Sequence, residues 1–263
     1  MKTGRIMACA LRHLYLYKRS LPRLMEIFYW PLLDLLVWGF ISTYLIRYNG
    51  ELPDFVAFFM GALILWDILF RSQQGISIAF LEDMWSRNLV NIFVSPLTEA
   101  EYVASLLVIS AMKLVMASSV MILLAWLLYA FNVFTLGFAL VPLMMNLIVM
   151  GWSVGIVTAA VIMRFGQEAE VLAWGIAFLF QPVSAVFYPV SVLPPVLQAV
   201  AAALPSAHVF EGMRAVITDG TVPTAGVLKA TGLNVVYLAS SLAFFSWNLR
   251  TVKDKGLLAR VGE

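Results

Sequence analysis

Charged residues, cysteine and histidine are scarce in this chain of 263 residues. Only 12% of the residues are Asp, Glu, Lys or Arg, against about 25% in an average globular protein, and 62% are hydrophobic, against about 45–50%. The single cysteine excludes an internal disulfide and a cysteine-based zinc cluster, and two histidines leave little for a metal site. The 17 basic and 15 acidic residues give a net charge of +2, which offers no basic excess for binding nucleic acid. So little polar surface cannot coat a soluble globule, and the composition predicts a membrane protein.

Stretches without charge predict the membrane spans. Asp, Glu, Lys and Arg are absent from Leu114 to Met163, a run of 50 residues, which holds two spans of about 20 residues each and a turn near 131–137. A second run, Val171–Phe210, is broken by prolines, and a third, Ala230–Leu249, is one span long. We therefore predict an all-α polytopic membrane protein with one transmembrane domain over 1–263. Its expected parts are an interface helix at about 4–20, six transmembrane helices at about 24–46, 55–80, 106–130, 138–162, 171–189 and 228–249, and re-entrant short helices on the outer side at about 190–215.

The distribution of basic residues predicts the orientation. With the N-terminus inside, twelve Lys and Arg lie in inside segments, and only Arg47, Arg214 and Lys229 lie in outside segments. Because basic residues accumulate on the cytoplasmic side, both termini are expected in the cytoplasm. The C-terminal tail with Arg260 is therefore expected on that side.

Residues 4–20 predict an amphipathic helix that lies on the membrane. Arg5, Arg12 and Arg19 recur every seven residues and therefore share one stripe, opposite a mainly apolar side. This helix is either a basic anchor held by anionic lipid or an elbow helix that also contacts a cytoplasmic partner.

Two motifs bear on enzymatic function. Gly151-Trp152-Ser153-Val154-Gly155 matches the G-x-S-x-G pattern of hydrolases, but that pattern needs a strand-to-helix turn and lies here inside the longest uncharged run. We interpret Gly151 and Gly155 as small residues that let another helix approach closely. The sequence contains no G-x-x-x-x-G-K-[ST] phosphate loop. We therefore expect no catalytic residues in this chain and no ATP bound through that motif.

Three charged residues deep inside the first two predicted spans are candidates for a functional role. Asp34 and Arg71 are expected roughly 13–15 Å from the cytoplasmic side at a rise of 1.5 Å per residue, and Asp67 lies one helical turn from Arg71. Charges at such depth either pair helices or line a transport pathway. A proton relay is the least favoured role, because no further ionisable residue continues it across the membrane.

The cytoplasmic stretch between the second and third predicted spans contains a short helix. Its apolar residues follow the i, i+3, i+4 spacing of one helix face: Leu89, Ile92 and Phe93. Pro96 ends this helix, and Thr98 with Glu101 predicts a capping box at the start of the next one. A short, partly apolar helix in this position suits docking into a groove of another protein.

Two segments resemble the permeases of type-2 ABC exporters. The first segment resembles their intracellular coupling region. In that region an Arg is followed by a short helix and then by a corner formed by a small residue, a proline and an apolar residue. The matching residues here are Arg87, Asn88, Leu89, Ile92, Phe93, Ser95, Pro96 and Leu97. The other is similar to the family's fifth span, which breaks into short helices that form an outer gate, and its matching residues are Pro182, Tyr188, Pro189, Pro194, Pro195, Pro205 and Arg214. The chain departs from the family at Val90 and Asn91, where members often carry an acidic residue, and at Ala185, where they often carry glycine.

The resemblance implies a transmembrane subunit of an ATP-driven exporter. Two copies of this permease would pair with two copies of a separate ABC ATPase, which would bind ATP and Mg²⁺, while this chain would bind no cofactor or metal of its own. It would lie in the bacterial cytoplasmic (inner) membrane, either as a homodimer or paired with a related permease. Exporters of this outline carry lipid-linked glycans, lipids or hydrophobic drugs.

The alternative function is an ATP-independent channel or proton-coupled carrier. The set of Asp34, Asp67 and Arg71 motivates it, because these residues lie within the predicted spans. Transport driven by a pH gradient without ATP distinguishes this alternative from the exporter.

Overall fold

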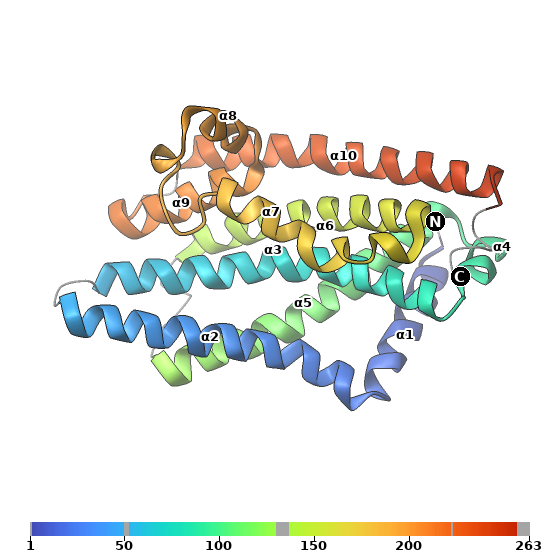
Figure 1. The fold of residues 1–263 in the computed structure, drawn as a ribbon, viewed down its shortest axis with the longest axis horizontal. Helices are drawn as coiled ribbons and strands as arrows, with labels where there is room; N and C mark the ends of the chain where they lie inside the picture. Colours follow the sequence, from blue (N-terminus) through green and yellow to red (C-terminus); the bar gives the residue numbers. More distant parts are fainter. Residues whose placement is uncertain (1, 50–52, 130–136, 222, 257–263) are drawn as a thin grey trace.

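The computed structural model describes residues 2–49, 53–129, 137–221 and 223–256, and over these residues it contains helices and no strand (Figure 1). The predicted turn near 131–137, apart from Gly137, lies outside the described residues, as does Arg260. The helices are α1 (Thr3–Lys18), α2 (Leu21–Asn49), α3 (Pro53–Trp85), α4 (Leu89–Val94), α5 (Glu99–Tyr129), α6 (Leu140–Phe165), η2 (Gly166–Ala169), α7 (Leu172–Val183), η3 (Val190–Val192), α8 (Pro195–Ala203), α9 (Pro205–Asp219) and α10 (Thr224–Asp254).

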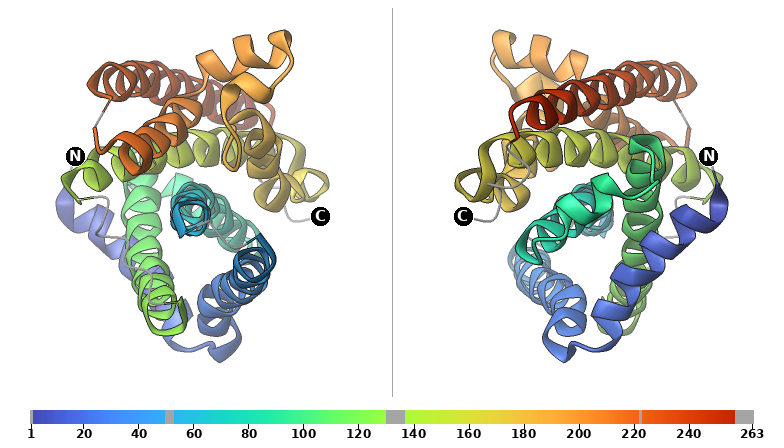
Figure 2. Two further views of the ribbon diagram at one scale, coloured as in Figure 1. Left: turned by 90° about the vertical axis from the view of Figure 1, so that its left-hand side faces the viewer. Right: turned by 90° about the vertical axis from the view of Figure 1, so that its right-hand side faces the viewer.

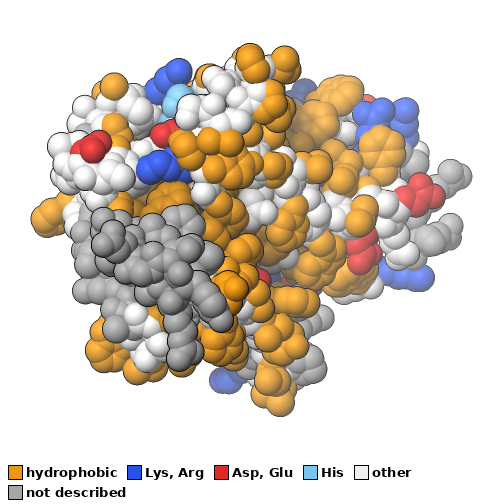
Figure 3. All heavy atoms as spheres, turned by 60° about the vertical axis from the view of Figure 1, so that its left-hand side comes forward, with side chains coloured by type: hydrophobic (Ala, Val, Ile, Leu, Met, Phe, Trp, Pro, Cys, Tyr) orange, Lys and Arg blue, Asp and Glu red, His pale blue; other side chains and the backbone are white. Residues whose placement is uncertain are grey.

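Three of the described helical segments are long and apolar enough to cross a membrane by length and composition. They are Glu99–Tyr129, Gly137–Ala169 and Thr224–Asp254. Apolar side chains cover the middle of the face shown in Figure 3, and most charged side chains on that face lie toward its two ends. The structure therefore confirms an all-helical chain of the membrane class.

Prolines and glycines set many helix ends. Pro195 and Pro205 occupy the first turns of α8 and α9, where a missing backbone N–H is not needed. Gly166 follows α6 at φ +70°, and Gly220 follows α9 at φ +66°, conformations that glycine adopts without a steric penalty. The fifth span was expected over 171–189, but α7 already ends at Val183, because the chain turns through a left-handed residue two positions later.

Helix α3 lies at the centre of the bundle. It packs mainly on α6 and α5, while α10 packs on α6 and α2 packs on α5 and α3 (Figures 1 and 2). The contact between α3 and α6 is very close: a Cβ built on Gly151 would lie 2.5 Å from the Leu69 carbonyl oxygen, and one on Gly155 would lie 2.8 Å from the Gln73 carbonyl oxygen. The interpretation of Gly151 and Gly155 as helix-contact residues is therefore confirmed.

The short helices occupy opposite ends of the bundle. Helices α1 and α4 lie together at one end, and α8 lies with α9 at the other (Figure 1). Helix α10 returns to the first end, where Lys253 lies 5.2 Å from the centre of the Phe93 ring. The start of α1 and the end of α10 thus each contact the segment around α4, and this end of the molecule carries the first candidate site.

Candidate functional site

Helix α4 and its flanking turns are held by hydrogen bonds within the segment. The turn before α4 passes through Arg87 at φ +53°, and the Asn88 backbone N–H donates to the Asp83 carbonyl oxygen at 2.9 Å. After α4, the Ser95 hydroxyl donates to the Ile92 carbonyl oxygen at 2.6 Å, and the Leu97 N–H donates to the Ser95 hydroxyl oxygen at 3.3 Å. These bonds make 87–97 a short, rigid element that protrudes between two long helices.

The apolar residues predicted for docking face the protein's own interior. Leu89 is 3% exposed and Ile92 is 7% exposed, and the Phe93 ring packs edge-on against Tyr102 at 5.3 Å between ring centres. The outward side of α4 is formed instead by Val90 and Val94, which are 40% and 81% exposed, with Asn91. Val90 and Val94 are therefore the apolar side chains that α4 presents to its surroundings.

The predicted capping box at the start of α5 is confirmed. The Thr98 N–H donates to a Glu101 carboxylate oxygen at 3.0 Å, and the Glu101 N–H donates to the Thr98 hydroxyl oxygen at 3.2 Å. The same carboxylate accepts a hydrogen bond from the Lys2 backbone N–H at 2.7 Å and lies 3.6 Å from Arg5. Glu101 therefore ties the start of α1 to the start of α5.

A buried charged cluster that the sequence did not predict joins α1 to the end of α3. Arg12 Nη2 donates to Asp83 Oδ1 at 2.5 Å, and the two ring nitrogens of His13 lie 3.3 Å from Glu82 Oε2 and 3.4 Å from Asp83 Oδ2. Tyr102 Oη donates to Asp83 Oδ2 at 2.9 Å. Burial alone would lower the pKa of His13, but its hydrogen bonds to Asp83 and Glu82 outweigh that effect and raise the pKa above 6.5.

Of the three charges in predicted spans, the structure joins two in an ion pair. Arg71 Nε lies 3.1 Å from Asp67 Oδ1, one turn apart on α3. Asp34 is exposed on α2 and lies within Coulombic range of the same guanidinium. This arrangement is compatible with both roles considered for the set, the pairing of helices and a position beside a transport pathway.

The outer segment is folded around Arg214. Its guanidinium Nη2 donates to the carbonyl oxygens of Ala185 at 3.1 Å and Tyr188 at 2.8 Å, and its Nη1 lies 2.8 Å from Glu211 Oε1. Tyr188 Oη donates to the Pro182 carbonyl oxygen at 2.6 Å. The arginine thus satisfies carbonyl groups of the turn that follows α7, while the Tyr188 hydroxyl satisfies one in the last turn of α7.

The remaining prolines of the predicted outer gate stand at helix starts. Pro189 comes directly before η3, Pro194 caps α8, and Pro195 and Pro205 are the first residues of α8 and α9. Each fixes φ near −65° at a position where the chain changes direction. All the residues predicted for this region therefore fall on or beside the turns that connect α7, α8 and α9.

Ala185 holds a conformation that suits glycine. It lies at φ +52° and is fully buried, and a left-handed conformation is unfavourable by about 1–2 kcal/mol for a residue with a Cβ. We expect Ala185→Gly to stay within about 1 kcal/mol of wild-type stability, because relief of strain offsets the lost methyl packing. Ala185→Val should lose about 2 kcal/mol or more, because a β-branched side chain is added at the same φ. Thermal unfolding in detergent measures both, and equal stability of the two variants would contradict this interpretation.

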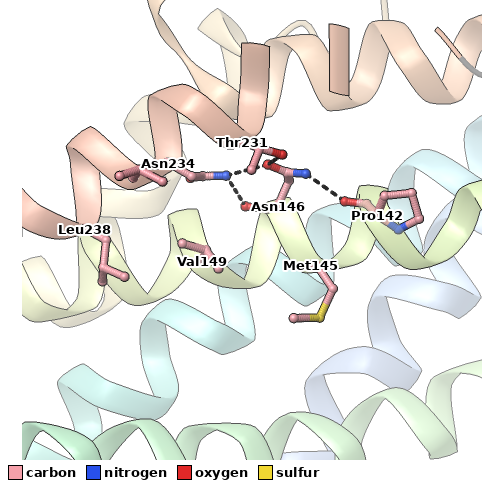
Figure 4. Close-up of a pocket in the computed structure, with 8 residues that line it drawn as sticks. Pro142, Met145, Asn146, Val149, Thr231, Asn234 and Leu238 are labelled. Atoms are coloured by element: carbon pink, nitrogen blue, oxygen red, sulfur yellow. Dashed lines mark hydrogen bonds between the residues drawn. The ribbon is translucent and has the colours of Figure 1, made fainter. Parts of the chain in front are cut away.

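A second polar site lies between α6 and α10 (Figure 4). The Asn234 amide nitrogen donates to Asn146 Oδ1 at 2.8 Å and to the Asn146 carbonyl oxygen at 2.9 Å, and Thr231 Oγ1 lies 3.3 Å from Asn146 Oδ1. A groove of about 390 Å³ passes beside these residues, and its other walls are mostly apolar. Hydrogen bonds between helices of this kind stabilise packing where the surroundings are apolar. Asn146 lies in the first uncharged run and Asn234 in the last, and no local spacing connects the two in the sequence.

Two other kinds of site were considered for this chain, a metal site and a serine nucleophile. The described residues contain no group of three or more His, Cys, Asp or Glu side chains placed to hold a metal ion. Ser153, the serine of the hydrolase-like motif, is 2% exposed, and its hydroxyl donates to the Val149 carbonyl oxygen at 2.8 Å. That bond runs within its own helix, so the serine is arranged as a packing residue.

Comparison with known proteins gives one family. A family model described as an ABC-2 type transporter matches residues 5–218, which covers the region from α1 through almost all of α9. A search of curated proteins found no match.

Proposed function

Since this chain belongs to the ABC-2 type transporter family and is thus the membrane component of an ABC transporter, we propose that it is the transmembrane subunit of an exporter driven by a separate ATPase. In this proposal the ATPase contacts the segment 87–97, and ATP-driven closure of the ATPase moves α4 and, through it, α3 and α5. The transmission is a movement of packed helices rather than a chemical step.

The observation that best supports this function is that α4 is packed on the protein along one side and exposed on the other. Its inner side is packed through Leu89 and Ile92, while Val94 projects into the surroundings. A force applied at Val94 is therefore transmitted to the core without first bending a loose loop. The hydrogen bonds at Ser95 and Asn88 add to this rigidity.

The assembly is proposed as two permeases with two ATPases. Six spans formed by α2, α3, α5, α6, α7 and α10 would place α1 and α4 in the cytoplasm of a bacterial inner membrane, with the re-entrant α8 and α9 on the outer side. The alternation of these helices between the two ends of the bundle supports this order (Figure 1). ATP and Mg²⁺ would be bound by the partner ATPase, and a second copy of this chain would complete the pathway.

The proposed substrates are apolar or amphipathic: a lipid-linked glycan, a lipid or a hydrophobic drug. Asp34, Asp67 and Arg71 would either border the pathway or pair its helices, and Arg214 with the prolines of the outer segment would shape the exit. Among the α2 residues whose side chains the structure describes, most exposed ones are apolar, including Trp30 and Phe40, which supports a substrate or a second copy of similar character at this face.

Reconstitution in liposomes tests the proposed function. We expect a fluorescent lipid or hydrophobic dye to be moved only when permease, ATPase and hydrolysable ATP are all present, and the non-hydrolysable nucleotide serves as control. Permease alone under a pH gradient should move neither probe. If the permease alone transports under that gradient and ATP has no effect, the channel or proton-coupled carrier replaces the exporter.

A further inference from the structure

Helix α1 contacts the chain on both sides of the coupling helix α4. Before α4, Arg12 and His13 contact Asp83 in the last turn of α3, four residues before Arg87. After α4, Arg5 Nη1 donates to the Pro96 carbonyl oxygen at 2.5 Å. A groove of about 330 Å³ lies between α1 and α4. Helix α1 is therefore held to the chain both before and after α4, with the groove between the two helices.

The attachment at Asp83 is too buried to be an ordinary surface ion pair. His13 is fully buried, Asp83 is 1% exposed and Glu82 is 5% exposed. Exposed ion pairs contribute little, whereas removing one member of a buried pair leaves the other charge uncompensated and is strongly unfavourable. A helix that served only to rest on lipid would not need such a cluster on its protein-facing side.

We propose that Arg12 and His13 are positioning residues that fasten the interface helix to the coupling segment, so that α1 and α4 move as one unit, and that this fastening loosens when His13 loses its proton. The role of this movement in transport rests on the proposed function. The attachment of α1 to the coupling segment is a property of the permease alone.

The groups around His13 determine the direction of the pH effect. Two carboxylates from α3, Glu82 and Asp83, face its ring; Arg12 lies beside it on α1, and the Tyr102 hydroxyl of α5 donates to Asp83. Protonated His13 adds a positive charge opposite the carboxylates. Because its pKa is raised above 6.5 in the folded chain, the stabilisation is fully present below that value and is lost as the pH rises through the raised pKa. The contact between Arg12 and Asp83 does not involve the His13 proton, so α1 should loosen without detaching.

Cys9 provides a native reporter of this attachment. It is the only cysteine in the chain, is partly buried, and lines the groove between α1 and α4. Loosening of α1 should expose its thiol. The rate at which a maleimide labels Cys9 therefore measures how firmly α1 is held.

The test compares three variants of the purified permease in lipid nanodiscs without any ATPase. Arg12→Gln and His13→Gln each remove a contact, and Arg19→Gln removes the same charge from an exposed site on the same stripe. Each labelling rate is divided by that of the same protein unfolded in SDS, so that ionisation of the thiol itself cancels. We expect Arg12→Gln and His13→Gln to label about tenfold faster than wild type at about pH 6, and Arg19→Gln to match wild type.

The pH profile of the wild-type protein tests the role of His13 without a substitution. Its normalised rate should rise severalfold between about pH 6 and about pH 9, while His13→Gln should be fast and flat over that range. A wild-type rate that is flat with pH, or variant rates equal to wild type, would overturn the inference. Neither result depends on ATPase binding, so failure of this inference and failure of the proposed function are distinguishable.

Discussion

Val94→Asp is expected to weaken binding of the ATPase about 30-fold or more while leaving the permease folded. Val94 is 81% exposed, so a carboxylate there stays hydrated in the free permease. In the complex the same charge would be buried against an apolar contact, and loss of such a contact at the centre of an interface is worth about 2 kcal/mol or more. Titration of the labelled ATPase onto permease in nanodiscs measures the dissociation constant, and ATP-driven transport should fall with it.

The isosteric Val94→Thr is the matched control, because it keeps the shape of valine and adds no charge. It should bind the ATPase within a fewfold of wild type. Phe93→Asp is a poorer test, because the Phe93 ring packs on Tyr102 and lies under Lys253, so that variant also disturbs the fold. Undiminished binding and transport by Val94→Asp would show that α4 is not the docking element.

Gly151→Ala is expected to destabilise the permease by about 3 kcal/mol, although alanine favours helices more than glycine does. The added Cβ would lie 2.5 Å from the Leu69 carbonyl oxygen and 2.7 Å from Ser72 Cβ. Because the first of these atoms belongs to the backbone of a packed helix, relief requires α3 and α6 to separate. Thermal or denaturant unfolding in detergent measures the loss.

Gly232→Ala is expected to have the opposite effect on the stability of the same protein. Gly232 lies within α10, and a Cβ there would have no neighbour within 4 Å. Its substitution should therefore leave stability unchanged or raise it by up to about 1 kcal/mol. If Gly151→Ala and Gly232→Ala have equal stability, the close contact of α3 with α6 does not determine the fold.

Local rules predicted the features that depend on neighbours in sequence. The capping box at Thr98 and Glu101, the end of α4 near Pro96 and the close contact at Gly151 and Gly155 all follow from short-range patterns. The periodicity also identified the apolar face of α4. It could not tell whether that face packs on the protein itself or on a partner, because both environments favour the same residues.

Long-range polar contacts could not be predicted in the same way. His13 meets Glu82 and Asp83 across about 70 positions of the chain, and Asn146 meets Asn234 across 88. No local spacing connects such residues, and the arginine stripe of α1 suggested contact with lipid. Two of those arginines also contact carboxylates of the chain itself, Glu101 and Asp83.

A single crosslink tests the central proposal most directly. Val94→Cys in a Cys9→Ser background gives the permease one cysteine, placed at the tip of α4, and Leu228→Cys in the same background places one at the 72% exposed start of α10. In the complex reconstituted with its ATPase, a short thiol-to-amine crosslinker should join position 94 to the ATPase and leave position 228 unjoined. A complex that hydrolyses ATP and transports, yet gives no crosslink from position 94, would contradict coupling through this helix.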